Sequence, residues 1–252
     1  ILGSGDIGLI MARRMVYEGA EVRMVCEIMP YSGGLKRNIV QCLEDNGIPL
    51  RLSTTVTRVK GEKRVEGVYI AKVDAQGKPI AETEEFVECD CLLLSVGLIP
   101  ENDLLNGTEI EISAATNGPA VNENRRTNIP GVFSCGNSLH VHDLVDNVSR
   151  ESEIAGTGAA DYASGRKETE KVRKVIPGEG VRYVLPQVIT GLTGEANLFF
   201  RVRDVYKGKT IRVLSGTEEL YKRKAVVLTP GEMESVTVKK ESIKGDIRVT
   251  IE

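Results

Sequence analysis

The sequence predicts an α/β fold that is followed by a small all-β region. A glycine-rich turn near the N-terminus joins an apolar strand to a helix with an apolar stripe (Ile7, Met11, Met15). From Val181 onward, short β-rich runs alternate with turns rich in Gly and Asp, and no helical pattern occurs. These two observations place parallel α/β structure first and a β-sandwich or barrel last.

The turn has the G-x-G-x-x-G spacing of a Rossmann-like dinucleotide site. Gly3 permits a tight turn, Gly5 lets a pyrophosphate approach the backbone, and Gly8 lets the helix pack closely on the strand. The N-terminus of the helix offers N–H groups and a partial positive charge to the phosphates. We therefore expect six cofactor-binding positions in this turn: Gly3, Ser4, Gly5, Asp6, Ile7 and Gly8.

The second strand, Glu21 to Cys26, is followed by Glu27, an acid that can accept both hydroxyls of an adenine ribose. A 2′-phosphate would be repelled by Glu27, and no basic residue follows before Lys36. The sequence therefore predicts NAD(H) rather than NADP(H). The alternative is a glycine turn in an unrelated α/β protein.

Composition excludes several classes of function. The 252 residues are 41% hydrophobic, which allows a substantial core, and the net charge of −3 argues against nucleic acid as a partner. No stretch approaches the roughly 18 apolar residues of a membrane span, and none resembles a signal peptide, so we expect a cytoplasmic protein. Only Ile1 and Leu2 precede the glycine turn, so we expect the chain to be cut from a longer polypeptide.

The segments after Glu27 complete the first domain, residues 1–97. A helix from Leu35 to Asp45 should end at Asn46-Gly47, and Leu50 to Ser53 reads as the next strand. Residues 55–90 alternate as an antiparallel meander. The run Cys91 to Val96 is continuously apolar, which predicts a strand buried on both faces, and Gly97 at its end is a further cofactor-binding candidate.

The five cysteines include no C-x-x-C pair, which argues against a dithiol relay. They are expected to be small buried side chains in a reducing compartment: Cys26, Cys42, Cys89, Cys91 and Cys135. No partners for a metal site at Cys89-x-Cys91 can be found in the sequence.

A third motif, Thr127 to Asn137, contains Pro130-Gly131-Val132-Phe133 and ends in Gly136-Asn137. With the glycine turn and the Leu92 to Pro100 run, it resembles the pyridine nucleotide–disulfide oxidoreductase superfamily over residues 1 to about 165. Within it, the chain resembles flavin subunits that accompany glycerol-3-phosphate dehydrogenases and similar amine-oxidising complexes.

The resemblance implies that residues 98–170 are the C-terminal segment of an FAD-binding domain. It implies flavin contacts at Gly136, Asn137 and the start of a helix near Leu144. Asn137 replaces the family's Asp, which should weaken the contact with the ribityl chain. The family's N-terminal FAD half is missing from the sequence, so we expect the whole protein to bind FAD and this fragment to bind it poorly and to be inactive alone.

The pair His140-x-His142, followed by Asp143, could ligate a metal or move protons near the flavin. The same segment enters a helix, for which Asp143 is a suitable N-cap. The sequence favours capping for Asp143 and no metal site, and it leaves a proton-transfer role open for the histidines. It identifies no catalytic residue.

After a charged linker (Arg166 to Lys174), residues 178–252 are expected to form the all-β domain. Its basic residues should form an exposed face, and docking of a partner oxidoreductase subunit is an alternative role: Arg201, Arg203, Lys207, Lys209 and Arg212.

The resemblance implies an oxidoreductase that passes hydride between NAD(H) and FAD and then electrons to an unidentified acceptor. The competing hypothesis is a non-enzymatic NAD-binding module, such as a redox sensor or an assembly subunit.

Overall fold

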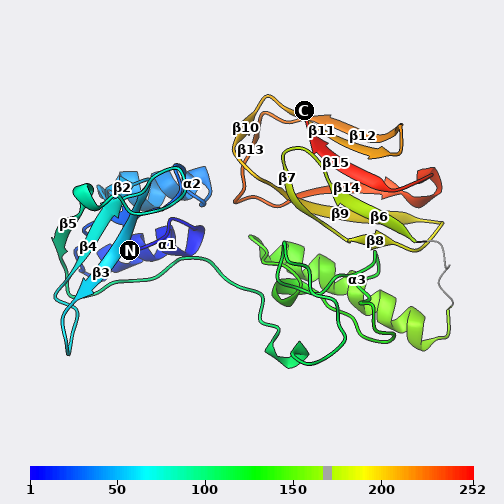
Figure 1. The fold of residues 1–252 in the computed structure, drawn as a ribbon, viewed down its shortest axis with the longest axis horizontal. Helices are drawn as coiled ribbons and strands as arrows, with labels where there is room; N and C mark the ends of the chain where they lie inside the picture. The colour runs from blue at the N-terminus through cyan, green and yellow to red at the C-terminus, as the bar shows by residue number, and fades with distance from the viewer. Residues whose placement is uncertain (167–171) are drawn as a thin grey trace. The chain divides into compact units, whose positions relative to one another are not determined.

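The computed structural model describes residues 1–166 and 172–252 of the chain (Figure 1). It forms two compact units, Ile1–Gly97 and Leu98–Glu252, which are described separately. The expected linker from Arg166 to Lys174, and the end of the expected 98–170 segment, fall partly outside the described residues. In the described part of the chain, no helix is both long and apolar enough to cross a membrane.

A parallel sheet lies at the centre of the first unit. Strand β1 (Val25–Cys26) pairs with β2 (Leu50–Arg51), and Leu2 forms parallel bridges to both Cys26 and Leu94. The first strand of the chain therefore lies between the segment of Leu94 and β1. The order in which the parallel strands are added thus reverses beside the first strand, as in a Rossmann-like sheet.

Two helical segments accompany this sheet. Helix α1 (Asp6–Tyr17) buries Leu9 and Ala12 in a core shared with β1. The helix expected from Leu35 to Asp45 is divided into α2 (Lys36–Asn38), the π-helical turn η1 (Ile39–Leu43) and the 3-10 turn η2 (Glu44–Asn46). The wider π turn lets the adjacent Cys42 and Leu43 both face the core. As predicted, the segment ends at Gly47, whose φ is +65°.

The predicted meander is confirmed as a three-stranded antiparallel sheet in the order β3-β4-β5. Its strands are β3 (Thr54–Lys60), β4 (Gly67–Lys72) and β5 (Glu85–Glu88), with the 3-10 turn η3 (Ala81–Thr83) before the last. Val68 and Ile70 of β4 join Cys26 of β1 in a common core, which fixes the meander against the parallel sheet.

The prediction of a strand buried on both faces at Cys91 to Val96 is wrong. Backbone hydrogen bonds join this segment to Leu2 along one edge only, and Leu94 and Val96 are each 67% exposed. Cys91 is exposed as well, contrary to the expectation of a buried thiol. Leu94 and Val96 are exposed because no described element of this unit covers their side of the segment.

The second unit begins with irregular chain that contains the short turns η4 (Asp103–Leu105) and η5 (Gly136–Ser138). Helix α3 (Val145–Ala163) follows, and its buried positions are Glu151, Ala155 and Gly158. The i, i+4, i+7 spacing of these three residues marks one face of the helix.

The rest of this unit is a β-sandwich, as the sequence predicts (Figure 1). One sheet has the order β12-β11-β15-β6-β8 and the other has the order β14-β9-β7. A core of Val, Ile, Leu and Phe side chains from both sheets lies between them. The strands are β6 (Arg173–Pro177), β7 (Val181–Leu185), β8 (Val188–Ile189), β9 (Glu195–Val202), β11 (Thr210–Ser215), β12 (Glu218–Lys224), β14 (Glu234–Lys239) and β15 (Ile247–Ile251), with β10 (Tyr206–Lys207) paired to β13 (Val227–Leu228) and the turn η6 at Lys240–Ser242.

Two expectations for this region are corrected. Residues 173–177, assigned to the linker and its end, form strand β6 because Val175 is buried in the sandwich core and pairs with Ile247. Arg201 does not belong to an exposed basic face, since its side chain is only 12% exposed. The sequence does not predict this burial, because an arginine is buried only where tertiary packing supplies hydrogen-bond acceptors for its guanidinium.

Candidate functional site

The glycine-rich turn lies at the carboxyl end of the parallel strands. Gly3 has a φ of +99°, and a Cβ there would lie 2.0 Å from the carbonyl oxygen of Ser95, so only glycine fits. A Cβ on Gly8 would lie 2.5 Å from the carbonyl oxygen of Gly3, so helix and turn pack closely. Gly5 differs, because no described atom lies within 4 Å of a Cβ placed on it. The backbone at Gly5, beside the uncapped N-terminus of α1, is therefore open to a ligand.

Glu27 follows β1 at the same edge of the sheet and is only 8% exposed. Its Oε2 accepts hydrogen bonds from the backbone N (2.9 Å) and the Oγ (2.6 Å) of Ser4, and its Oε1 accepts one from the backbone N of Met29 (3.0 Å). A carboxylate oxygen accepts about two hydrogen bonds. Oε1 can therefore accept one further hydrogen bond, from one ribose hydroxyl, whereas the sequence predicted that Glu27 would accept hydrogen bonds from two hydroxyls.

The other candidate residues of this turn have different surroundings. Asp6 accepts hydrogen bonds from the backbone N of Leu35 (2.8 Å) and from Nδ2 of Asn38 (2.7 Å), so its carboxylate holds the next helical segment. Ile7 is 62% exposed in the first turn of α1. Gly97 has a φ of +102° and open space around it.

The segment that the sequence assigned to the flavin surrounds turn η5 in the second unit. Gly136, with a φ of +68°, donates its backbone N–H to Oε2 of Glu151 at 2.9 Å. Asn137 accepts a hydrogen bond on Oδ1 from the backbone N of His142 at 3.1 Å. Leu144 is the N-cap residue of α3, and no side chain caps that helix. The three positions therefore belong to one continuous loop that leads into a helix N-terminus.

The prediction that Asp143 caps α3 is wrong. Its Oδ2 instead accepts a hydrogen bond from the backbone N of Met233 at 3.0 Å, in the β-sandwich. The helix begins after Leu144, so the carboxylate of Asp143 contacts the sandwich rather than the first turn of the helix.

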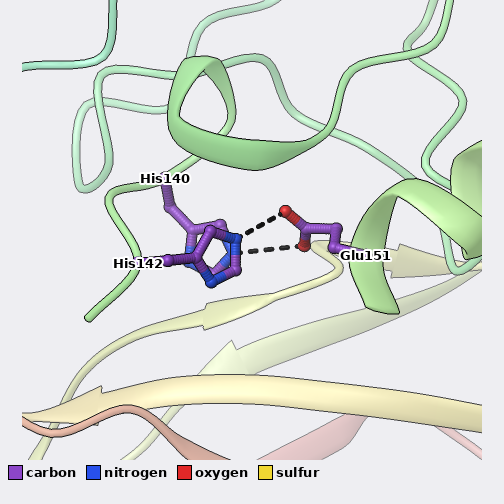
Figure 2. Close-up of side chains that lie close together, drawn as sticks. All are labelled: His140, His142 and Glu151. Carbon is purple, nitrogen blue, oxygen red and sulfur yellow. Dashed lines mark hydrogen bonds and ion pairs between the residues drawn. The ribbon is translucent and has the colours of Figure 1, made fainter. Parts of the chain in front are cut away.

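Glu151 is the centre of a buried polar cluster that the sequence analysis missed (Figure 2). His140 Nε2 lies 3.1 Å from its Oε1, and His142 Nε2 lies 2.9 Å from its Oε2. Burial alone would raise the pKa of Glu151, but hydrogen bonds from both imidazoles and the charge of Arg125 together hold that pKa well below 4.5. The carboxylate is therefore ionised at neutral pH although it is fully buried.

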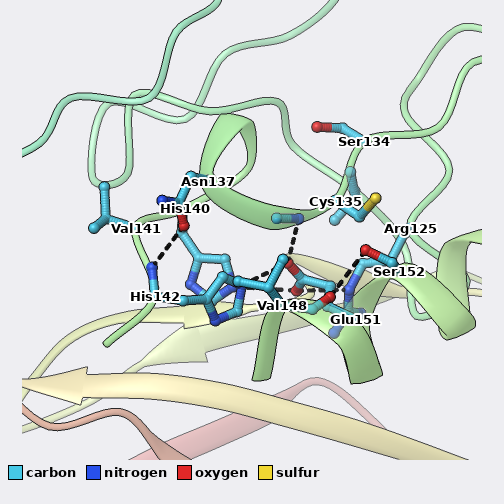
Figure 3. A network of polar contacts seen from close by, with 12 residues as sticks. Arg125, Ser134, Cys135, Asn137, His140, Val141, His142, Val148, Glu151 and Ser152 are labelled. Carbon is cyan, nitrogen blue, oxygen red and sulfur yellow. Dashed lines mark hydrogen bonds and ion pairs between the residues drawn. The ribbon is translucent and has the colours of Figure 1, made fainter. Parts of the chain in front are cut away.

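Arg125 supplies the opposite charge (Figure 3). Its side chain is also fully buried, its Nε lies 3.0 Å from Oε1 of Glu151, and its guanidinium lies 5.4 Å from the centre of the Phe199 ring. Burial lowers the pKa of Arg125 and the charge of Glu151 opposes that shift. Removal of either partner would leave an uncompensated buried charge.

The ligand atoms of His140, His142 and Glu151 all lie within 4.8 Å of one another, which is the spacing of a metal site. The carboxylate, however, already accepts four hydrogen bonds, from Arg125, Gly136 and both imidazoles. Four bonds match the lone-pair capacity of a carboxylate. A divalent cation would have to replace two of these donors beside a guanidinium charge, so the geometry favours a hydrogen-bonded cluster.

One sequence signal could have revealed Glu151. It occupies the buried face of α3 together with Ala155 and Gly158, where a lone acid interrupts a small, apolar stripe. A buried acid requires partners, and the two imidazoles of the chain precede it by 11 and 9 residues. Arg125 carried no comparable signal, because it reaches Glu151 from a separate loop.

The chain matches the pyridine nucleotide-disulphide oxidoreductase family over residues 1–155. An NADH oxidase of Streptococcus pyogenes is 28% identical over 209 residues, which are 77% of this chain and 42% of that protein. A dihydrolipoyl dehydrogenase of Buchnera aphidicola is 26% identical over 174 residues, which are 66% of this chain and 34% of that protein. The chain thus spans less than half the length of these relatives.

Solved structures agree on the fold. The thioredoxin reductase of T. acidophilum superposes with a TM-score of 0.55 and 24% identity, covering 66% of this chain and 52% of that one. The thioredoxin reductase of Lactococcus lactis gives a TM-score of 0.56 at 16% identity, covering 65% of this chain and 52% of that one.

Fold and site together define an α/β protein with a dinucleotide-type glycine turn. The chain belongs to the pyridine nucleotide-disulphide oxidoreductase family, whose members are oxidoreductases that depend on FAD and NAD(H).

Proposed function

We propose that this chain carries the NAD(H) site of a flavin-dependent oxidoreductase, together with part of its FAD site. The observation that carries the proposal is the open backbone at Gly5, which lies between the uncapped N-terminus of α1 and the buried acid Glu27. An anion can approach this backbone without a steric conflict, and the helix N-terminus favours negative charge there.

In this proposal different residues of the turn bind different parts of NADH. Gly5 and the first N–H groups of α1 receive the pyrophosphate, and Oε1 of Glu27 accepts one hydroxyl of the adenine ribose. Ser4 holds Glu27 in place through two hydrogen bonds to Oε2, so its role is to orient the acid. Because Glu27 is anionic, a 2′-phosphate at this position would be repelled, and NADH is preferred over NADPH.

The flavin side of the proposal rests on the loop from Gly136 to Leu144. Asn137 offers an amide to the ribityl chain, and the uncapped start of α3 at Leu144 offers N–H groups to the flavin carbonyl. When bound, NAD(H) and FAD supply the hydride-transfer chemistry, and the protein supplies position and electrostatics. In this proposal residues 1–97, 98–170 and 178–252 are the NAD-binding domain, the FAD-binding segment and the all-β domain.

The relatives support the class of reaction rather than the acceptor. They include proteins named NADH oxidase, dihydrolipoyl dehydrogenase and rubredoxin-NAD(+) reductase, whose acceptors differ. The acceptor is not identified by the sequence resemblance, which suggests a partner oxidoreductase subunit such as those in complexes with glycerol-3-phosphate dehydrogenases.

Anaerobic titration with NADH tests the proposal in protein isolated with its flavin. Loss of the absorbance band of oxidised flavin on addition of NADH is the expected result, and Gly5→Val should prevent it. A full-length protein that binds NADH but never carries flavin would refute the oxidoreductase and favour a non-enzymatic NAD-binding module.

A further inference from the structure

Arg201 of β9 is one of the residues through which the β-sandwich contacts the loop from Gly136 to Leu144. Its Nε donates to the hydroxyl of Tyr183 at 3.2 Å, and its Nη2 donates to the carbonyl oxygen of Val141 at 3.1 Å. The same Nη2 lies 3.6 Å from Oδ1 of Asp143. Nη1 is held within the sandwich by the carbonyl oxygens of Pro230 and Gly231. Arg201 thus connects two strands of the sandwich to the loop.

Tyr183 of β7 links Arg201 to His140 by hydrogen bonds. Its hydroxyl oxygen accepts the hydrogen bond from Arg201, which leaves its own hydrogen for Nδ1 of His140 at 3.4 Å. Burial raises the pKa of Tyr183, so the phenol remains protonated at neutral pH. The aromatic rings of Tyr183 and His140 also meet edge to face, with centroids 5.9 Å apart.

The direction of each hydrogen bond then follows from Glu151. An ionised carboxylate can only accept, so Nε2 of His140 must carry the hydrogen that bonds to Oε1. Burial lowers the pKa of His140, which keeps the ring neutral, and its Nδ1 is therefore an acceptor for Tyr183. The chain of bonds runs from Arg201 through Tyr183 and His140 to Glu151, where Arg125 donates from the other side.

His142 provides an internal reference for this arrangement. Its Nε2 lies 2.9 Å from Oε2 of Glu151, so this nitrogen carries a hydrogen, as Nε2 of His140 does. Its Nδ1 is buried and has no hydrogen-bond partner among the described residues. The two imidazoles therefore differ at Nδ1, where His140 meets the hydroxyl of Tyr183 and His142 has no hydrogen-bond partner among the described residues.

We infer that Tyr183 and Arg201 are positioning residues, through which the β-sandwich fixes the orientation of His140 and thereby the conformation of the loop from Gly136 to Leu144. Glu151 extends the effect to the turn, because it binds His140 and the backbone N–H of Gly136 with the same carboxylate. The sandwich is thus a structural support for that loop. This inference does not depend on the proposed function.

Nitrogen-15 NMR of histidine-labelled protein tests the inference directly, since the chain has only two histidines. In the wild type, the ring of His140 should be neutral with its hydrogen on Nε2, and Nε2 of His142 should also carry a hydrogen. The Nδ1 resonance of His140 should lie upfield of that of His142, as expected for an acceptor that receives a hydrogen bond. A hydrogen on Nδ1 of His140 would overturn the inference.

Tyr183→Phe removes only the hydroxyl and keeps the ring in the core. The Nδ1 resonance of His140 should then move downfield to the position of an unbonded nitrogen. Amide hydrogen exchange in residues 136–144 should become about tenfold faster, the equivalent of one hydrogen bond. Tyr221→Phe on β12 is the matched control in the other sheet and should change neither quantity.

Two further outcomes would contradict the assignment. An unchanged His140 resonance in Tyr183→Phe would show that the hydroxyl does not position the ring. A stoichiometric shift of both Nε2 resonances on titration with Zn²⁺ would show that the cluster is a metal site. If these tests succeed and the full-length protein carries no flavin, the proposed function fails while the positioning role stands.

Discussion

Replacement of Glu151 by Gln should strongly destabilise the second unit. The substitution keeps the size of the side chain but removes the charge that faces Arg125, whose guanidinium is fully buried. It also places an NH₂ group where N–H donors converge: two donors point at each carboxylate oxygen, so either orientation of the amide brings donors together. Breaking a buried ion pair by removal of one partner costs about 3–5 kcal/mol.

Native-state hydrogen exchange of the α3 amides measures this cost where it arises. The opening free energy of α3 should fall by about 3–5 kcal/mol in Glu151→Gln. Glu153→Gln is the matched control, because Glu153 is exposed on the same helix and its replacement should change the value by no more than about 0.5 kcal/mol. Equal effects of the two substitutions would refute the view that Glu151 is an ionised, fully bonded centre.

Two further predictions concern pH and the glycine turn. In the folded chain the pKa of His140 lies below 6.5 and that of Glu151 below 4.5, so the unfolded chain binds more protons in acid. The free energy of unfolding should therefore fall as pH drops below 6.5, and more steeply below 4.5. The slope should be about 1.4 kcal/mol per pH unit for each additional proton that the unfolded chain binds. Thermal unfolding at a series of pH values checks this, and a stability that rises toward acid would contradict it. Gly5→Val should abolish NADH binding but leave the circular dichroism unchanged, because Gly5 has a φ of −65° and open space for a Cβ. Normal NADH affinity in this variant would show that the turn is not the cofactor site.

The sequence predicted those parts of the fold that local patterns specify. The glycine spacing, the alternation of the meander and the short β-runs after Val181 each depend on neighbouring residues, and each predicted its structure. The exposed segment at Leu94 and Val96 was misread because a continuous apolar run does not reveal whether both faces are covered. Residues 173–177 were misread because the pairing of β6 with β15 joins distant parts of the chain.

The polar cluster shows where local patterns stop being informative. His140 and His142 were noticed as a pair, but their partners come from a loop at Arg125, from helix α3 and from the sandwich strand of Tyr183. Such contacts depend on tertiary packing, so no spacing rule predicts them. Arg201 was assigned to an exposed basic face for the same reason.

Calorimetric titration of the chain with NADH and NADPH tests the central claim most directly. In the proposed site Glu27 accepts a ribose hydroxyl and no basic residue follows it before Lys36, so NADH should bind and NADPH should bind much more weakly. Glu27→Ala should weaken NADH binding by about 1–3 kcal/mol. The substitution removes a hydrogen bond between a charged group and the ribose, and it also removes the contacts of Glu27 that order the turn. Equal or tighter binding of NADPH by the wild-type chain would contradict the account.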